Sequence, residues 1–469
     1  MSRVFNIGWS QVDITPDEQV PLRGQYYPRL SRGVHSRLGA TILAMEGSVD
    51  EQAMFICIDA VGCPQEFLNA LRDRLGRAIS DLDASKVVVN VTHSHNAPSI
   101  GGNPDASAKE HAFIERVLGK LTEASVKAWR NKAPAGVARA VDFATIGHCR
   151  RAAYSNGTAE MYGETSRQDF IGMEGNEDST VELMFTFDAG QKATGAIVNI
   201  ACPSQVMEAT YEISSDFMGA LREKLKSRFG PEFNTLCQIS AAGCQSPRDL
   251  VRTTDNEFWS PRGVESLSTR LFDAVIRGYE ARGETDYSPC LAHRVEKITL
   301  PKRRASYTDY VQALREIEGV DEKRVFADFC AQVEANEMIP NRPGPYDSKL
   351  HPFSLLRNAQ AVIKRRQEQD ESPNFEMELH AVRVGDAIFV TNPFELFLDY
   401  GHQIKARSRA SQTFVVQLCC GYEGYLPTRR AEKLGNYGAL ISNGIVGYDG
   451  GQKLVDETIS AINEVFATE

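Results

Sequence analysis

The chain has 469 residues, with 52 Lys and Arg against 62 Asp and Glu and a formal net charge of −10. This acidic balance, without a block of basic residues, excludes nucleic acid as the main partner. Ten cysteines are too sparse for a disulfide scaffold, and the sequence has no apolar run of the roughly 18 residues that span a bilayer. We therefore expect a cytoplasmic protein with a small-molecule substrate and no stable membrane association, and leave open a homo-oligomer.

The first third of the sequence predicts a β-α-β unit. Residues 53–59 and 86–91 form apolar runs rich in β-branched side chains, as in strands buried on both faces. Between them, residues 65–82 carry apolar side chains three and four positions apart, which is typical of an amphipathic helix. Strand, helix and strand in this order indicate an α/β fold.

The same alternation of strands and helices continues along the rest of the chain. Residues 302–370 differ, because they are more polar and have helical periodicity. We expect one domain over residues 1–469, with mixed sheets flanked by helices and a mostly helical insertion at 302–370. The other elements predicted are strands at 180–187, 196–201, 235–240, 376–384, 386–391 and 413–418, and helices at 216–229 and 452–467.

The segment Thr-His-Ser-His-Asn-Ala-Pro at 92–98 directly follows a predicted strand. Loops at strand ends are where α/β enzymes usually place their chemistry. One of His93 and His95 could bind a metal while the other faces the substrate, because imidazole is both a common metal ligand and a proton carrier. A His-x-His pair is common, however, and two hydrogen-bonded loop histidines explain it equally well.

Two other candidate residues lie far away in the sequence. Glu395, in Asn-Pro-Phe-Glu-Leu-Phe, follows a predicted strand and precedes a helix, where a carboxylate can point into a cleft or simply favour the helix N-terminus. Tyr425 lies in Gly-Tyr-Glu-Gly-Tyr-Leu-Pro-Thr, where tyrosines more often pack or hydrogen-bond than bind metal. Neither residue, taken alone, indicates an active site.

Taken in order, several segments resemble the neutral ceramidase family of zinc amidohydrolases. The resemblance implies the fold of the ceramidase catalytic domain. True ceramidases carry an additional C-terminal β-sandwich domain, which we do not expect here. The segments are Val-Asp-Ile-Thr-Pro at 12–16, Gly-Val-His at 33–35, the histidine segment at 92–98, Ala-Gly-Cys-Gln-Ser-Pro at 242–247, Pro-Phe-Glu at 393–395 and Tyr-Leu-Pro-Thr at 425–428.

The resemblance also implies functional residues around one zinc ion. His93, Glu395 and Tyr425 match family zinc ligands. The matching catalytic residues are His95, Ser246, Tyr437 and an arginine that is either Arg150 or Arg151.

One departure from the family pattern concerns the metal. The family has a second histidine ligand where this chain has Pro203, which offers no donor atom. The neighbouring Cys202 could replace it as a thiolate, because zinc accepts mixed cysteine, histidine and carboxylate ligands. A buried cysteine at a strand end is an equally good explanation. The remaining donors that could complete the site are His35, Gln205, Glu208 and Asp216.

The resemblance predicts a hydrolase that cleaves an amide, ester or lactone through metal-activated water. Zinc lowers the pKa of bound water from 15.7 to about 7. His95 would then carry a proton, and Tyr437 with one of the two arginines would hold the developing oxyanion. Ser246 could orient the substrate or attack it directly.

The sequence favours a small polar substrate, because it has no amphipathic segment suited to a membrane surface. A carbohydrate-derived or acidic compound would suit the arginines near the motifs, although most of these arginines are as easily explained as surface charge. They are Arg150, Arg151, Arg248, Arg429 and Arg430.

Two alternative functions remain. A metal-dependent lyase or isomerase acting on a carbohydrate or cyclitol would use the same metal, because zinc polarises a carbonyl as readily as it activates water. A binding protein that has kept the fold but lost the metal would account for Pro203.

Overall fold

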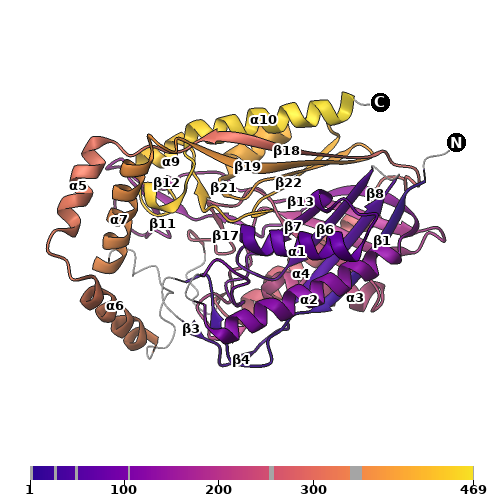
Figure 1. Ribbon diagram of the computed structural model, residues 1–469, viewed down its shortest axis with the longest axis horizontal. Helices are drawn as coiled ribbons and strands as arrows, with labels where there is room; N and C mark the ends of the chain where they lie inside the picture. The colour runs from indigo at the N-terminus through magenta and orange to yellow at the C-terminus, as the bar shows by residue number, and fades with distance from the viewer. Residues whose placement is uncertain are drawn as a thin grey trace.

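The computed structural model describes residues 4–25, 29–47, 51–103, 106–252, 258–337 and 351–467 (Figure 1). A large and a smaller β-sheet occupy the middle of the molecule, and long helices lie outside them. Among the described residues, no helix has both the length and the apolar character needed to cross a membrane.

The larger sheet contains eight strands within the described residues. It bends between β1 and β8, whose pairing covers only Asn6 and Ile7 of β1 in the described part of the chain. Because of this bend, β16 returns to contact β5, β6 and β7. Only β6·β7 and β14·β16 are parallel among the described pairs of this sheet. Its spatial order is β16 (Asn234–Ile239), β14 (Ala193–Ile200), β13 (Thr180–Asp188), β8 (Ala133–Phe143), β1 (Asn6–Asp13), β5 (Gly39–Glu46), β6 (Gln52–Ile58) and β7 (Val87–Val91).

The predicted β-α-β unit is confirmed. β6 and β7 are parallel neighbours whose residues are all buried, as their continuous apolar sequences predict. The helix between them, α1 (Gln65–Ala78), is shorter than predicted, because Ile79 has extended backbone angles and a short 3-10 turn follows.

A second sheet packs against the first. Phe389 of the second sheet stacks on Phe414 with ring centroids 4.3 Å apart and also meets Phe55 of β6 at 5.3 Å. Such aromatic contacts bury large areas, so they fix the two sheets against each other. In spatial order the described strands of this sheet are β18 (Leu291–Pro301), β19 (Asn374–Val384), β20 (Ala387–Thr391) and β22 (Gln412–Val416), with β20 and β22 parallel.

Helices cover the outer side of each sheet (Figure 1). The fold-class prediction of mixed sheets flanked by helices is therefore confirmed. On the larger sheet lie α2 (Ala108–Arg130), which packs on β1 and β5, α3 (Asp216–Phe229) on β16 and α4 (Pro261–Glu280) on β8 and β13, while α1 packs on α2. On the second sheet lie α8 (Leu398–Arg407) on β22 and α10 (Tyr448–Ala467) on β18 and β19.

Residues 302–370, which were expected to be mostly helical, contain three helices among their described residues. They lie at one end of the molecule, on the left of Figure 1. Phe329 of α6 packs on Phe353 of α7, with ring centroids 5.1 Å apart. The helices are α5 (Tyr307–Ile317), α6 (Glu322–Glu337) and α7 (Pro352–Glu368).

Several strand ends meet at one place, and backbone hydrogen bonds connect the segments that follow them. The backbone N–H of Ser204, after β14, donates to the Thr92 carbonyl, after β7, with an N···O distance of 3.2 Å. Gly243, after β16, donates to Leu396 at 2.8 Å. The short elements in and around these segments are β2 (Pro21–Leu22), β3 (Arg29–Leu30), β4 (Gly33–Val34), β9 (His148–Cys149), β10 (Arg151–Tyr154), β11 (Ala159–Met161), β12 (Phe170–Met173), β15 (Glu212–Ile213), β17 (Gln245–Ser246), β21 (Glu395–Leu396), β23 (Tyr425–Leu426) and α9 (Arg429–Leu434).

Candidate active site

His93 occupies the first turn after β7 and is buried. Its backbone is left-handed, with φ of 55°, a conformation in which histidine is more frequent than most residues. The ring Nδ1 lies 2.6 Å from the Val61 carbonyl oxygen. Since a carbonyl only accepts, Nδ1 carries the proton and Nε2 presents a lone pair to the interior of the site.

His95 lies beside His93 and is also buried. Its Nε2 is 3.2 Å from Nε2 of His93 and 2.8 Å from Nε2 of Gln205. Its Nδ1 lies 3.0 Å from Oε2 of Glu208. Sequence reasoning named Gln205 and Glu208 only as fallback donors, and the structure brings both against His95.

The buried guanidinium of Arg29 holds these segments together. It donates to the backbone carbonyls of Glu208 and Thr210 at 2.7 and 2.6 Å, and it also donates to the carbonyls of Arg23 and His95. One side chain thus fixes the backbone on both sides of the His95–Glu208 contact. No sequence pattern indicates this role, because buried and exposed arginines are indistinguishable in a single sequence.

Glu395 and Tyr425 reach the same place on neighbouring short strands. They are register partners in the parallel pair β21·β23. Oε2 of Glu395 lies 3.7 Å from Nε2 of His93. The strand pairing thus explains why a carboxylate and a phenol 30 positions apart lie side by side.

Arg150 faces this cluster, whereas Arg151 does not. The Arg150 guanidinium donates to the hydroxyls of Tyr162 and Tyr425 at 3.0 and 3.3 Å and lies 3.8 Å from Glu395. Arg151 instead pairs with Glu174 and donates to the carbonyls of residues 435 and 437. Adjacent residues of an extended segment point to opposite sides, so only one of the two can enter the site.

Ser246 and Tyr437 complete the cluster at its edges. The Tyr437 hydroxyl lies 3.4 Å from that of Tyr425. Ser246 is buried, hydrogen-bonds Tyr162 and accepts from the backbone of Arg248. Tyr162, on which Ser246 and Arg150 both converge, had no signal in the sequence.

Tyr422 is a further residue that sequence analysis did not select, although it lies in the quoted segment around Tyr425. Its ring is 6.4 Å from that of His93 and packs on Gly62, where a Cβ would lie 2.6 Å from the ring. Glycine is therefore required at position 62 for the tyrosine to reach the site.

Burial sets the protonation of the site. It lowers the pKa of His93 to about 4, against the opposing charge of Glu395, and lowers the pKa of His95 well below its usual value. It also raises the pKa of Glu208 to about 7 and the pKa of Tyr425 well above its usual value. Both imidazoles are therefore neutral at physiological pH, the form in which histidine binds metal.

Cys202, Asp216 and His35, unlike Gln205 and Glu208, have their contacts outside the His93–His95 pair. The Cys202 thiol lies 3.5 Å from the Ile146 carbonyl, and burial raises its pKa, which disfavours a thiolate. Asp216 accepts from the backbone of Met207 at 2.8 Å. His35 lines a separate cavity of about 420 Å³ beside β1 and α3. These contacts of Cys202 are those of a buried structural cysteine, the alternative that the sequence left open.

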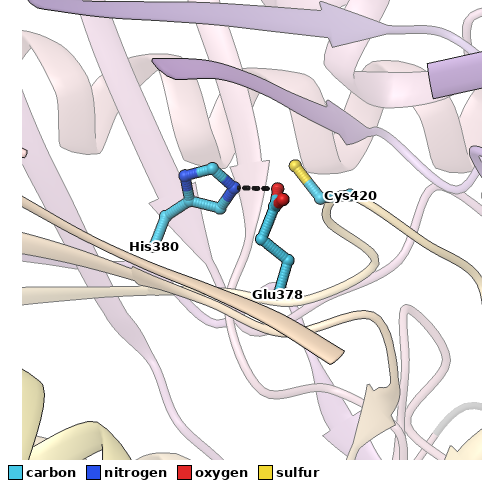
Figure 2. A group of neighbouring side chains, drawn as sticks. All are labelled: Glu378, His380 and Cys420. Atoms are coloured by element: carbon cyan, nitrogen blue, oxygen red, sulfur yellow. Dashed lines mark hydrogen bonds and ion pairs between the residues drawn. The ribbon is translucent and has the colours of Figure 1, made fainter. Parts of the chain in front are cut away.

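A second group of metal-type donors lies outside this site. In the described part of the chain, Glu378, His380 and Cys420 form the only group of three His, Cys, Asp or Glu residues whose donor atoms all lie within 4.8 Å of one another (Figure 2). Glu378 and His380 are neighbours on one face of β19, and their side chains touch at 2.6 Å. The donor atoms around His93 do not all lie within 4.8 Å of one another in the described part of the chain.

An internal cation already fills this second group. Nη2 of Arg72 lies 2.6 Å from Glu378, 3.4 Å from His380 and 3.9 Å from Cys420. It also donates to the Val87 carbonyl at 2.7 Å, so the guanidinium is held firmly between α1 and the sheet. The position a metal ion would take is therefore occupied by a side chain.

The hydrogen-bond contacts of His380 are all satisfied when it carries a proton on each ring nitrogen. His293 Nδ1 donates to the Gln52 carbonyl at 3.0 Å, so its Nε2 must accept from Nδ1 of His380 at 2.9 Å. Nε2 of His380 then donates to Glu378. Although burial opposes it, the neighbouring Cys420 and Glu378 raise the pKa of His380, in agreement with this assignment.

Comparison with solved structures gives the same fold over nearly the whole chain. The crystal structure of neutral ceramidase from Pseudomonas aeruginosa matches with a TM-score of 0.69 and 14% identity, covering 99% of this chain and 75% of that one. A structure of ceramidase complexed with C2 matches with a TM-score of 0.66 and 14% identity, over 99% and 76% of the two chains. The chain has the ceramidase fold. No protein-family model and no curated protein sequence matches it.

Proposed function

We propose that this protein is a metal-dependent hydrolase that cleaves an amide, ester or lactone bond in a small polar substrate. The ceramidase fold supports this class of reaction by analogy, because the ceramidases it resembles are amide hydrolases. The observation that carries the proposal is the pairing of a neutral His93 with the Glu395 carboxylate at 3.7 Å, deep in a cluster of polar side chains.

The donor chemistry around His93 fits a zinc ion. His93 has one ring nitrogen held by a carbonyl and the other directed at Glu395, an orientation typical of metal-binding histidines. Catalytic zinc sites use three protein ligands, often histidine and carboxylate, and leave one position open. His93, Glu395 and Tyr425 are the residues that would hold zinc. Zinc supplies Lewis acidity and activates water at neutral pH when it is bound.

The remaining side chains suit stabilisation of negative charge on a substrate carbonyl. Arg150 is a buried cation whose guanidinium already donates to two phenols. Tyr437 extends this row of donors to the edge of the cluster. Such fixed donors are effective because they need no reorganisation when charge develops. We assign Arg150 and Tyr437 to the carbonyl oxygen, and Ser246 to holding Tyr162.

The substrate class follows from the charges near the cluster. Arg150 is buried within it, whereas Arg429 and Arg430 are exposed and Arg151 is bound elsewhere. The cluster also contains several hydroxyl and amide groups, from tyrosines and Gln205. A hydroxylated or acidic compound, such as a sugar-derived amide or lactone, would use both kinds of donor.

A binding protein without a metal is the second candidate. It is favoured by Pro203, which has no donor where the ceramidase family has a histidine, and by the direction of Cys202. The same phenols and arginine would then bind a polar ligand without chemistry.

Metal analysis combined with a substrate panel tests the proposal. The purified full chain is dialysed, its metal content is measured by mass spectrometry, and amides, esters and lactones of short acids and sugar acids are screened for release of a carboxylate. We expect stoichiometric zinc and a hydrolysed substrate. His93→Ala should lose both, and Tyr437→Phe should keep zinc while kcat falls about 10²-fold.

His111→Ala is the matched control, because this histidine is exposed on α2. A wild-type protein that binds no zinc and hydrolyses nothing would overturn the proposal in favour of the binding protein. Unsaturated products without a new carboxylate would instead indicate a lyase.

A further inference from the structure

His93 and His95 share the orientation of metal-binding histidines. Nδ1 of His93 hydrogen-bonds the Val61 carbonyl at 2.6 Å, and Nδ1 of His95 lies 3.0 Å from Oε2 of Glu208, close to the oxygen but outside hydrogen-bond geometry. In each ring Nε2 faces the interior of the site, and the two Nε2 atoms lie 3.2 Å apart. Metal-binding histidines typically bind an oxygen acceptor through the nitrogen that does not touch the metal.

The distance between the two Nε2 atoms fits a shared cation as well as it fits a hydrogen bond. Two nitrogens bound to tetrahedral zinc at about 2.0–2.1 Å lie roughly 3.3 Å apart. Without a cation or a shared proton, two lone pairs would face each other across 3.2 Å in a buried site, an arrangement that is electrostatically unfavourable. Glu395, at 3.7 Å from His93, lies on the same side of that ring.

We infer that His95 is a metal ligand in this chain, that it replaces the histidine missing at Pro203, and that Glu208 orients it. The inference rests on the proposed function, because it concerns the same metal. His95 then joins the ligands already named, His93, Glu395 and Tyr425, with Glu208 behind His95 as the Val61 carbonyl is behind His93. Two histidines and one carboxylate form a known type of catalytic zinc site.

Two features of the site must change for the donors to surround one ion: the orientation of the Gln205 amide and the distances between the donor atoms. The amide nitrogen is 2.8 Å from Nε2 of His95 and its oxygen is 3.4 Å from Arg150. A 180° rotation of the Gln205 amide would move its N–H group away from the position of the cation. The rotation would break only the 3.4 Å contact between the amide oxygen and Arg150. The donors around His93 do not all lie within 4.8 Å in the described residues, so Glu395 must also move toward the ion.

The competing role of His95 is the one implied by the family resemblance, a proton carrier beside the metal. The two roles differ in one measurable respect. A ligand is required for metal binding, whereas a proton carrier is required only for turnover. Metal affinity therefore separates them without any knowledge of the substrate.

The experiment measures zinc affinity of the full-length protein by calorimetry and competition with a chelating dye. The variants are His93→Ala, His95→Ala and Glu208→Gln, with His111→Ala as the exposed control and circular dichroism as the test of folding. We expect His95→Ala to lose zinc as completely as His93→Ala does. Glu208→Gln should weaken zinc about 10–100-fold, the usual effect of losing an orienting partner.

The outcomes distinguish the inference from the proposed function. Zinc binding that survives in His95→Ala but not in His93→Ala would overturn the inference and leave the hydrolase proposal intact. Absence of zinc from the wild-type protein would overturn both.

A measurement on the wild-type protein avoids dependence on the folding of variants. Cobalt(II) replaces zinc in such sites, and proton NMR then shows a strongly shifted exchangeable N–H signal for each bound histidine. We expect signals from two histidines. A signal from one histidine would overturn the role of His95.

Discussion

The site around His93 and the group around Glu378 are made from the same kinds of residue, yet they are arranged for different purposes. Each combines a glutamate, an arginine and two histidines whose rings touch. In the Glu378 group His380 donates to Glu378 through one ring nitrogen and to His293 through the other, and His293 donates in turn to the Gln52 carbonyl. At the other site the two ring nitrogens face one another.

The position of the arginine makes the second difference. Arg72 binds Glu378 through two nitrogens, at 2.6 and 3.1 Å, and so fills the centre of that group. Arg150 contacts phenols and a carbonyl and remains 3.8 Å from Glu395. Donor residues in proximity are therefore not sufficient for a metal site. The direction of each lone pair, and whether an internal cation already satisfies it, decides the outcome.

Removing Arg72 should have the largest effect. Arg72→Met leaves the partly buried Glu378 carboxylate with His380 as its remaining cationic partner, and we expect the free energy of unfolding to fall by about 3 kcal/mol. Chemical denaturation measures this change. Arg74→Met is the control, because Arg74 pairs with the exposed Glu115 and its loss should cost no more than about 1 kcal/mol. Equal losses in the two variants would contradict the role given to Arg72.

Zinc should stabilise the protein by binding at the site around His93 and not at the group around Glu378. At a zinc concentration of 100 times Kd, we expect the wild-type protein to gain about 2.7 kcal/mol of stability. His93→Ala should abolish the gain, and Glu378→Gln should preserve it, since Arg72 and not a metal neutralises Glu378. Thermal melts with and without zinc, and after treatment with a chelator, provide the measurement. A gain that depends on Glu378 would reverse the assignment of the two sites.

A fall in pH should remove the stability that the Glu378 carboxylate contributes to the folded protein. Although burial opposes it, hydrogen bonds from His380 and Arg72 lower the pKa of Glu378 from 4.5 to about 2. A lowered pKa means that the folded state gains stability above pH 4.5 and loses it as the pH falls toward 2. We expect Glu378→Gln to cost about 2 kcal/mol at pH 7 and progressively less below pH 4.5. Denaturation at a series of pH values tests this, and an unchanged pH profile would contradict it.

Replacement of Cys202 should have the smallest effect, both on zinc affinity and on stability. Its thiol is bound to a backbone carbonyl, so Cys202→Ala should leave zinc affinity within about twofold of the wild type. The loss of a small buried side chain should cost about 1 kcal/mol of stability. Zinc titration of this variant beside His95→Ala makes the comparison direct. A large loss of zinc affinity in Cys202→Ala would restore the cysteine as a ligand.

The sequence by itself determined the local elements and the places where chemistry could lie. Continuous apolar runs predicted β6, β7 and the parallel connection through α1, because a strand buried on both faces must be apolar throughout. It did not reveal β1, β5, β8 or β18. The order of the motifs predicted the ceramidase fold, which the structural comparison confirms.

Tertiary structure alone decided which donors meet. Whether Arg150 or Arg151 enters the cluster depends on the face of one short strand, and the direction of Cys202 depends on the loop that covers it. Contacts such as His95 with Glu208, or Arg72 with Glu378, join segments more than 100 positions apart. No local pattern records such pairs, because they arise from the packing of strands that only the complete fold brings together.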